Sequence, residues 1–543
     1  MRANFVNIFD KTVREAELVS TDGLIRNIEI TGPENASLPY ILPGFTDAHV
    51  HIESSMLTPA QFARLAVVHG TVATVSDPHE IANVVGVEGV EFMIKDGKRV
   101  PFKFCFGAPS CVPATIFETA GATIDAGQVG ALLANDDIGY LAEVMNFPGV
   151  LHEDPDMIAK INLAKQHNKV IDGHAPGLRG KEAQKYASLG ITTDHECFTY
   201  EEAREKIDYG VKILIREGSA ARNFEALIPL ISEFPDRIMF CSDDKHPDNL
   251  VDGHINVLVK RALQLDYDLW DVLAAACVNP VLHYGLPVGL LRINDPADFI
   301  LIDNLTDFNV LETYLNGELV AQNGVSLLPD LRSEQINKFD CAAKTTSEFV
   351  FSPGKSGPVK IRVIEALEGQ LITNELIAEL PDAAGFQSDV SRDILKITVV
   401  NRYQNTAPAI AFIKNFGLQE GAIASSVAHD SHNIICVGCD DASICDAVNL
   451  VIEAKGGISV VSKNKKHILS LPIGGLMSDL DGYTVAQAYT DMDRFVKQEL
   501  KSTLKSPYMT LSFMALLVIP SLKLSDRGLF DGKNFRFVSN IIE

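Results

Sequence analysis

The chain has 543 residues, too many for one ordinary core, and its length predicts roughly two to four domains. Hydrophobic residues make up 46% and charged residues 22%, as is typical of a folded globular protein. A formal net charge of -24 repels phosphate backbones, so we expect no nucleic-acid partner, although a neutral small molecule is not excluded.

Membrane insertion and secretion are not expected either. The N-terminal segment carries charges without a continuous apolar stretch, so it does not resemble a secretory signal. The apolar run around 513–520 is too short to span a bilayer. Nine scattered cysteines, an odd number, do not form a disulfide framework, and the run NIICVGC around Cys436 and Cys439 predicts a buried strand rather than a zinc or redox pair. Together these features predict a cytoplasmic protein.

The chain begins with short β-like runs and turn residues up to about residue 42. From 43 to 283 one theme repeats, in which a short apolar strand ends in polar residues and a helix-forming stretch follows. Eight such strand ends occur, which predicts a parallel sheet closed into an α/β (β/α)8 TIM-like barrel. They are GFTDAHVHIE, TVATVSDPHE, FKFCFGAPS, IGYLAEVMN, KVIDGHAPG, GITTDHE, VKILIREGS and RIMFCSDDKHP.

Beyond 283 the β-like character returns, and Asn316-Gly317 is a strong hairpin signal. We expect 1–42 and 284–345 to pair into one small β domain built from both flanks of the barrel. A polar stretch then precedes the last zone, 346–543, which mixes strand and helix patterns and is expected to form an additional C-terminal α+β domain.

The predicted strand ends carry residue types that bind metals. His49 and His51 stand two apart on the first strand, so both imidazoles point to the same side. In such a barrel the reactive groups gather at the carboxyl ends of the strands. The other candidate ligands at these ends are Glu143, His174, His195 and Asp243.

Each candidate alone has an ordinary structural explanation, but their joint placement at successive strand ends does not. Four imidazoles and two carboxylates are too many for one open catalytic ion and suit two ions that share a bridging carboxylate. The donor set suits zinc, iron or manganese. We expect two divalent ions, and the donor set alone does not choose between Mn²⁺, Fe²⁺ and Zn²⁺. Five further histidines are interpreted as structural residues in helical or surface positions: His69, His152, His167, His254 and His467.

The stretch PGFTDAHVHIESSM resembles the first-strand motif of the amidohydrolase superfamily, and its HIESSMLTP part resembles the adenine deaminase branch. Similar matches are SDPHEIANVVG, LAEVMNFPGV, DGHAPGL, TTDHE and CSDDKHPD, followed by SVAHDSHNIICVG and LPIGGLMSD in the last zone. The resemblance therefore covers nearly the whole chain. It implies hydrolysis of adenine to hypoxanthine and ammonia by a metal-activated hydroxide in a binuclear site, in a homo-oligomeric enzyme.

The resemblance also implies roles for individual residues. His49 and His51 would bind the more buried ion, and His174 and His195 the second. Glu143 would bridge them in place of the carbamylated lysine found in many members.

For the chemistry, Asp243 would ligate metal and act as the catalytic proton acceptor. Glu53, Ser54 and His79 are candidates to bind the purine, and His79 could instead orient a ligand. Arg216 and Glu217 are weaker candidates that could pair with each other.

The run His429-Asp430-Ser431-His432 could be another metal site, but we interpret it as a loop that helps to close the active site, or else as a turn that caps a helix. Two other functions stay open. One is a different amidohydrolase that acts on a cyclic amide or an N-acyl substrate, and the other is a metal-free assembly scaffold.

Overall fold

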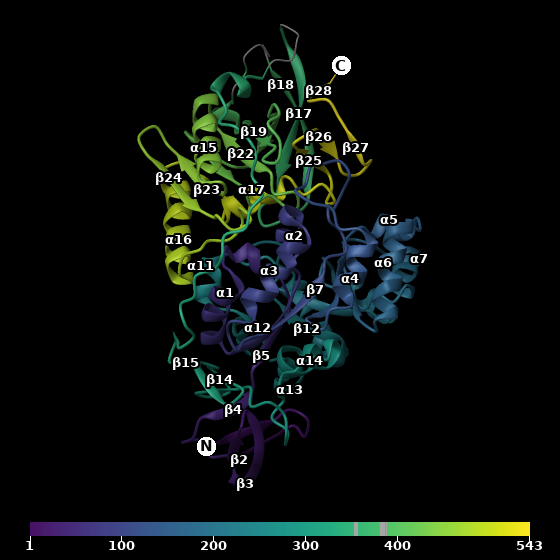
Figure 1. Ribbon diagram of the computed structural model, residues 1–543, viewed down its shortest axis with the longest axis vertical. Helices are drawn as coiled ribbons and strands as arrows, with labels where there is room; N and C mark the ends of the chain where they lie inside the picture. The colour runs from purple at the N-terminus through teal and green to yellow at the C-terminus, as the bar shows by residue number, and fades with distance from the viewer. Residues whose placement is uncertain (352–356, 381–385, 387, 543) are drawn as a thin grey trace.

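The computed structural model describes residues 1–351, 357–380, 386 and 388–542. Figure 1 shows an elongated molecule with the N-terminal strands at one end, the barrel in the middle and the C-terminal domain at the other end. Within the described residues, no helix is long and apolar enough to cross a membrane.

Strands from both flanks of the barrel form one sheet, in the order β16-β15-β14-β13-β4-β1-β2-β3. The junction is the antiparallel pair of β13 with β4, in which Ile300 faces Leu42. Asn316 and Gly317 both have positive φ, 49° and 78°, as the tight turn between β14 and β15 requires. The bounds are β1 (Arg2–Asn7), β2 (Thr12–Thr21), β3 (Leu24–Pro33), β4 (Tyr40–Pro43), β13 (Phe299–Ile302), β14 (Val310–Leu315), β15 (Glu318–Gln322) and β16 (Val325–Ser326).

The middle of the chain forms a closed barrel of parallel strands, which confirms the predicted fold class. β5 to β9 make one hydrogen-bonded run and β10 to β12 another. The Thr192 N–H donates to Ile171 O at 2.9 Å across one seam, and the Asp243 N–H donates to His49 O at 2.9 Å across the other. The bounds are β5 (Phe45–Val50), β6 (Thr71–Ser76), β7 (Lys103–Ala108), β8 (Ile138–Val144), β9 (Val170–Gly173), β10 (Thr193–Asp194), β11 (Lys212–Arg216) and β12 (Ile238–Cys241).

Helices surround the barrel and alternate with its strands, so each strand end leads into a loop at the same mouth. Several begin with side-chain caps. At α4, for example, the Asp125 carboxylate accepts from the Gln128 N–H at 2.9 Å. The bounds are α1 (Pro59–Ala66), α2 (His79–Val85), α3 (Val87–Gly97), α4 (Ala126–Leu133), α5 (Phe147–Leu151), α6 (Pro155–Gln166), α7 (Gly180–Ser188), α8 (Tyr200–Asp208), α9 (Phe224–Leu227), α10 (Leu230–Glu233), α11 (Pro247–Asp252), α12 (Ile255–Gln264), α13 (Leu269–Leu273) and α14 (Asn279–Tyr284).

The C-terminal domain is a mixed sheet in the order β18-β17-β20-β19-β22-β21-β23-β24, with β28 beside β17 and a separate β25-β26-β27 meander. Every residue of β22 is buried, and Cys436 and Cys439 are free thiols, so the predicted buried strand is confirmed. The strand bounds are β17 (Val359–Ala366), β18 (Thr373–Leu380), β19 (Leu395–Val400), β20 (Ala409–Lys414), β21 (Ala422–Ser425), β22 (Ile434–Gly438), β23 (Gly457–Val461), β24 (Lys466–Ser470), β25 (Leu522–Ser525), β26 (Gly528–Asp531), β27 (Arg536–Phe537) and β28 (Ile541–Ile542). Its helices are α15 (Asp441–Glu453), α16 (Gly482–Gln498) and α17 (Pro507–Phe513).

A buried carboxylate fastens the seam between the first and last barrel strands. Asp47 on β5 accepts from the Ser242 N–H at 3.0 Å, and its other oxygen lies 2.8 Å from His254 Nε2. The opposite nitrogen of His254 lies 2.7 Å from Thr71 Oγ1 on the second strand. His254 is fully buried at the N-cap of α12, so it has the helical context and structural role expected of it, and its ring joins three barrel strands.

We expect Asp47→Ala to lower the free energy of unfolding by about 3 kcal/mol, because buried donors on Ser242 and His254 lose their acceptor. Urea and thermal unfolding would measure the loss. Asp136→Ala, at an exposed position, is the matched control and should shift stability by less than about 0.5 kcal/mol. Equal stability of the two variants would show that the seam does not depend on this carboxylate.

Candidate metal centre and substrate cavity

All six predicted ligands meet at the carboxyl-end mouth of the barrel, and none is more than 8% exposed. His49, on β5, and His51, just beyond it, point the same way, with their Nε2 atoms 3.2 Å apart. His195 follows β10 and stacks on His49 with ring centroids 4.0 Å apart. Strand alternation thus brings imidazoles from separate strands to one point.

Glu143 lies between two sets of imidazoles. It is the penultimate residue of β8, and its Oε1 is 3.4 Å from His51 Nε2. Its Oε2 is 2.7 Å from His174 Nδ1 and 3.2 Å from His195 Nε2. Oε1 therefore faces His51, and Oε2 faces His174 and His195. This is the arrangement that a bridging ligand needs.

Asp243 completes the group from just beyond β12. Its Oδ1 lies 3.4 Å from His51 Nε2 and 3.7 Å from His49 Nε2. Its Oδ2 accepts from Arg216 Nη1 at 2.5 Å. The backbone φ of 53° is left-handed, a conformation that aspartate tolerates better than most residues. The two oxygens thus have separate partners, with Oδ1 directed at the imidazoles.

The ionisable groups of this mouth perturb one another strongly. Burial lowers the pKa of His49 well below its usual range, and the rings of His195 and His51 add to the effect. Burial acts the same way on His174, but the carboxylates of Glu196 and Glu143 outweigh it and raise its pKa to about 9. For Glu143 burial would raise the pKa, yet the imidazoles, His174 foremost, hold it well below its usual range. Buried carboxylates here are stabilised by positive charge, which protons or metal ions can supply.

Two residues of the mouth were missed or misjudged from the sequence. Glu196 is buried and forms an ion pair with Arg216, which also holds Asp243. Arg216 does not pair with Glu217, whose carboxylate instead lies 2.6 Å from Arg261 Nη1. Glu196 directly follows a candidate ligand, and that adjacency was the signal available in the sequence.

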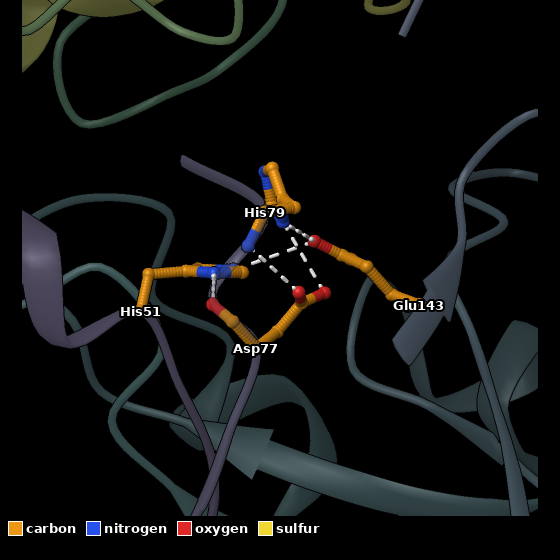
Figure 2. A group of neighbouring side chains, drawn as sticks. All are labelled: His51, Asp77, His79 and Glu143. Atoms are coloured by element: carbon orange, nitrogen blue, oxygen red, sulfur yellow. Dashed lines mark hydrogen bonds and ion pairs between the residues drawn. The ribbon is translucent and has the colours of Figure 1, made fainter. Parts of the chain in front are cut away.

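His79 reaches the centre, whereas the other two predicted purine contacts do not line the cavity. Figure 2 shows His79 and Glu143 pointing toward each other, with His79 Nδ1 3.5 Å from Glu143 Oε1 and 3.2 Å from Asp77 Oδ2. Ser54 lies behind the wall and donates to Asp244 Oδ1 at 2.5 Å.

Glu53 is buried in the same 3-10 turn, Ile52–Ser55, and accepts from the Ile81 N–H at 3.2 Å. Burial, the largest influence, raises its pKa to about 7. Through these bonds Glu53 supports the start of α2 and Ser54 supports Asp244. The second carboxylate oxygen of Glu53 is buried with no hydrogen-bond partner among the described residues.

A narrow cavity of about 30 Å³, the room of a few water molecules, lies above these groups. The C-terminal domain supplies both apolar and polar residues of its wall, among them two residues of the 429–432 loop that we expect to help close the site. These wall residues are Leu371, His429, Asp430, Phe513, Leu516 and Val518. A larger cavity of about 510 Å³ shares Met145 and Val518 with it and is the adjoining open space.

The loop between β21 and β22 meets the barrel at Glu80, in the first turn of α2. His429 Nδ1 lies 2.6 Å from Glu80 Oε1, and His432 Nε2 contacts the other oxygen. Burial lowers the pKa of His429, but the carboxylates of Glu80 and Asp244 outweigh it and raise it to about 9. Sequence reasoning did not connect residues 349 positions apart.

Known proteins and protein families match nearly the whole length of the chain. Residues 40–320 match the model of the amidohydrolase family, and 370–536 match the adenine deaminase C-terminal domain. The chain is 56% identical over 541 residues to an adenine deaminase of Sulfurovum sp., with 99% of both chains covered. It is 54% identical over 542 residues to an adenine deaminase of Salinibacter ruber, covering 99% of this chain and 98% of that protein. Among solved structures, a β-aspartyl dipeptidase of Fervidobacterium islandicum covers 60% of this chain and 96% of its own, at 16% identity and a TM-score of 0.46.

Proposed function

The chain belongs to the adenine deaminase branch of the amidohydrolase family, and we propose that its barrel mouth hydrolyses adenine to hypoxanthine and ammonia. The observation that carries the proposal is the convergence of four imidazoles and two carboxylates at one buried barrel mouth in a chain so similar to adenine deaminases.

The donor set fits two divalent ions. The Nε2 atoms of His49 and His51 approach each other and Asp243 Oδ1, an arrangement that brings lone pairs together. Glu143 offers one oxygen to each side, with His174 and His195 at the second. Within the described residues, His49 Nδ1 and His174 Nε2 are buried without a hydrogen-bond partner. These six residues would hold the ions, with Glu143 between them.

When bound, two divalent ions supply a strongly polarised water as the nucleophile at neutral pH. Asp243 Oδ1 accepts the proton of that water as the oxygen attacks C6 of adenine. Arg216 occupies Oδ2, which keeps Oδ1 directed at the reacting atoms. Of the two protons of the water, Asp243 would pass one to the amino group, which leaves as ammonia, and the other would end on ring nitrogen N1 of hypoxanthine. His79 contacts the purine or steadies Glu143, and its position allows both roles.

Four finer assignments belong to the same proposal. The ions are Mn²⁺ or Fe²⁺, with Zn²⁺ as the alternative, because imidazole and carboxylate ligands suit all three. The reaction places the enzyme in purine metabolism. Nine free thiols, each in a described part of the chain, support a reducing compartment such as the cytoplasm. The family resemblance supports a homo-oligomer.

The assay that tests the activity follows adenine by ultraviolet absorbance and ammonia release, in protein reconstituted with each of the three metals. We expect adenine to be converted and adenosine to react at least about 100-fold less efficiently, because the relatives that the chain matches are adenine deaminases and a ribose on N9 would need additional room in the buried mouth. Equal efficiency on both compounds, or ring opening of a cyclic amide instead, would refute the assignment.

Replacing Glu143 by Gln removes the negative charge between the two ions while the size of the side chain is kept. We expect loss of at least one metal equivalent and of most adenine turnover, measured by elemental analysis and by the deamination assay. Glu201→Gln, at an exposed position, is the control and should retain both. A Glu143→Gln protein that holds two ions tightly and turns over normally would exclude the bridging role.

Asp243→Asn keeps the shape of the side chain but cannot accept a proton. We expect kcat to fall by about 100-fold or more, the scale of general acid–base catalysis, while KM changes far less because ground-state contacts remain. Metal content must be measured in the same sample, with exposed Asp208→Asn as the control. If only KM rises, Asp243 binds substrate instead, and Asp244 becomes the candidate base.

A further inference from the structure

The contact between the 426–433 loop and Glu80 is a feature that the proposed chemistry does not use. The loop leaves β21, enters β22 and crosses from the C-terminal domain to the barrel mouth. Glu80, His429 and His432 are each no more than 2% exposed. Because a buried carboxylate must be paired, the two imidazoles and Glu80 stabilise one another across the domain boundary.

The hydrogen bonds of His432 argue against a third metal ion at this cluster, although its donor atoms lie within 4.8 Å of one another. His432 Nδ1 accepts from the Ala428 N–H at 3.2 Å, so the ring proton of the neutral imidazole lies on Nε2. That Nε2 faces the second carboxylate oxygen of Glu80 in an ion-pair contact. A metal ion would need the lone pair that this tautomer lacks at Nε2.

The same reasoning assigns the protons of His429. The Glu80 carboxylate only accepts, so the Nδ1 that lies 2.6 Å from it carries a proton. The ring is held by Phe513, which stacks on it at 5.1 Å and 25°. Within the described residues, Nε2 is buried with no hydrogen-bond partner, and the nearest carboxylate oxygen, Asp244 Oδ1, is 3.9 Å away. Against the effect of burial, the carboxylates of Glu80 and Asp244 raise the pKa of His429 to about 9, so at neutral pH the ring is an imidazolium with a proton on each nitrogen. His429 lines the cavity, and its Nε2–H is the donor left without a partner there.

We propose that His429 donates a hydrogen bond from Nε2 to a ring nitrogen of the purine, and that Glu80, itself held by His432, fixes the imidazole for this contact. The inference rests on the proposed deamination of adenine. It gives the C-terminal domain a direct part in substrate recognition, since the donor comes from that domain and its support from the barrel.

A donor at this position would act on both binding and reaction. Ring nitrogens of adenine are hydrogen-bond acceptors, and an unpaired buried donor penalises any base that lacks the acceptor. Attack at C6 moves negative charge onto the ring, so a donor that is already in place stabilises the transition state more than the ground state. The apolar neighbours Leu371, Phe513 and Leu516 suit the flat faces of the base.

The test combines protein variants that lack the His429 donor with adenine analogues that lack one acceptor nitrogen of the ring. The 1-, 3- and 7-deaza analogues of adenine, each lacking one ring nitrogen, are measured as competitive inhibitors of adenine deamination by the metal-loaded full chain. In the wild type we expect one analogue to bind about 10- to 100-fold more weakly than the other two. In His429→Phe, which keeps a ring but no N–H, that analogue should bind as well as the others.

Three further proteins make the outcome specific. His429→Gln retains an N–H and should keep part of the discrimination, and it also serves if His429→Phe does not fold. Glu80→Gln should weaken the discrimination, because Nδ1 loses its charged acceptor. His467→Ala, at an exposed position, should behave as the wild type. Melting temperature and metal content are measured for every variant.

Three results would overturn the inference. The first is a wild type that does not distinguish the three analogues, and the second is an unchanged pattern in a folded, metal-replete His429→Phe protein. The last is that the wild type tightly binds one ion more than the two proposed and that His432→Ala loses it, because the cluster of Glu80, His429 and His432 would then be a metal site. Release of ammonia from adenine by the wild type would uphold the proposed function in each case, so the two failures are distinguishable.

Discussion

The burial of the Glu143 carboxylate between imidazoles is the constraint on which the rest of the site depends. A buried carboxylate is stable only when cationic charge or good donors surround it. Here the partners come from three other strand ends, because His51, His174 and His195 all lie within 3.4 Å of its oxygens. Only a closed barrel brings these positions together, which makes the seam at Asp47 part of the chemistry as well as of the stability.

Charge balance also explains the surroundings of the site. Asp243 would be a second uncompensated carboxylate, and Arg216 compensates it while also binding Glu196. Arg216 is 2% exposed, so this pairing acts in a medium where electrostatic interactions are strong. A lysine could not reach both carboxylates with the same planar fork, which is a physical reason for arginine at the end of β11.

Local sequence patterns were sufficient to predict the main elements of the fold, whereas contacts between residues far apart in the chain could not be predicted from the sequence. The alternation of strand and helix patterns was sufficient for the barrel, and the spacing of His49 and His51 placed two imidazoles on one side of a strand. The ion pairs of Arg216 and the contact of Glu80 with His429 join residues far apart in the chain, and no periodic pattern reports such contacts. Glu53 and Ser54 stay candidate purine contacts, and strand periodicity does not predict the direction of their side chains, since the 3-10 turn after β5 breaks the strand alternation.

The strand that supplies the bridging carboxylate also leads to the wall between the two cavities. Glu143 points into the mouth, and two residues later Met145 lines both the narrow cavity and the larger one beside it. Val518 of the C-terminal domain is the other shared wall residue. The larger cavity is lined by apolar side chains together with charged ones such as Asp154 and Lys160, whereas the narrow cavity is lined mainly by ionisable groups. A barrel residue and a residue of the C-terminal domain therefore form the shared wall, so the two domains together shape the space beside the ionisable groups of the mouth.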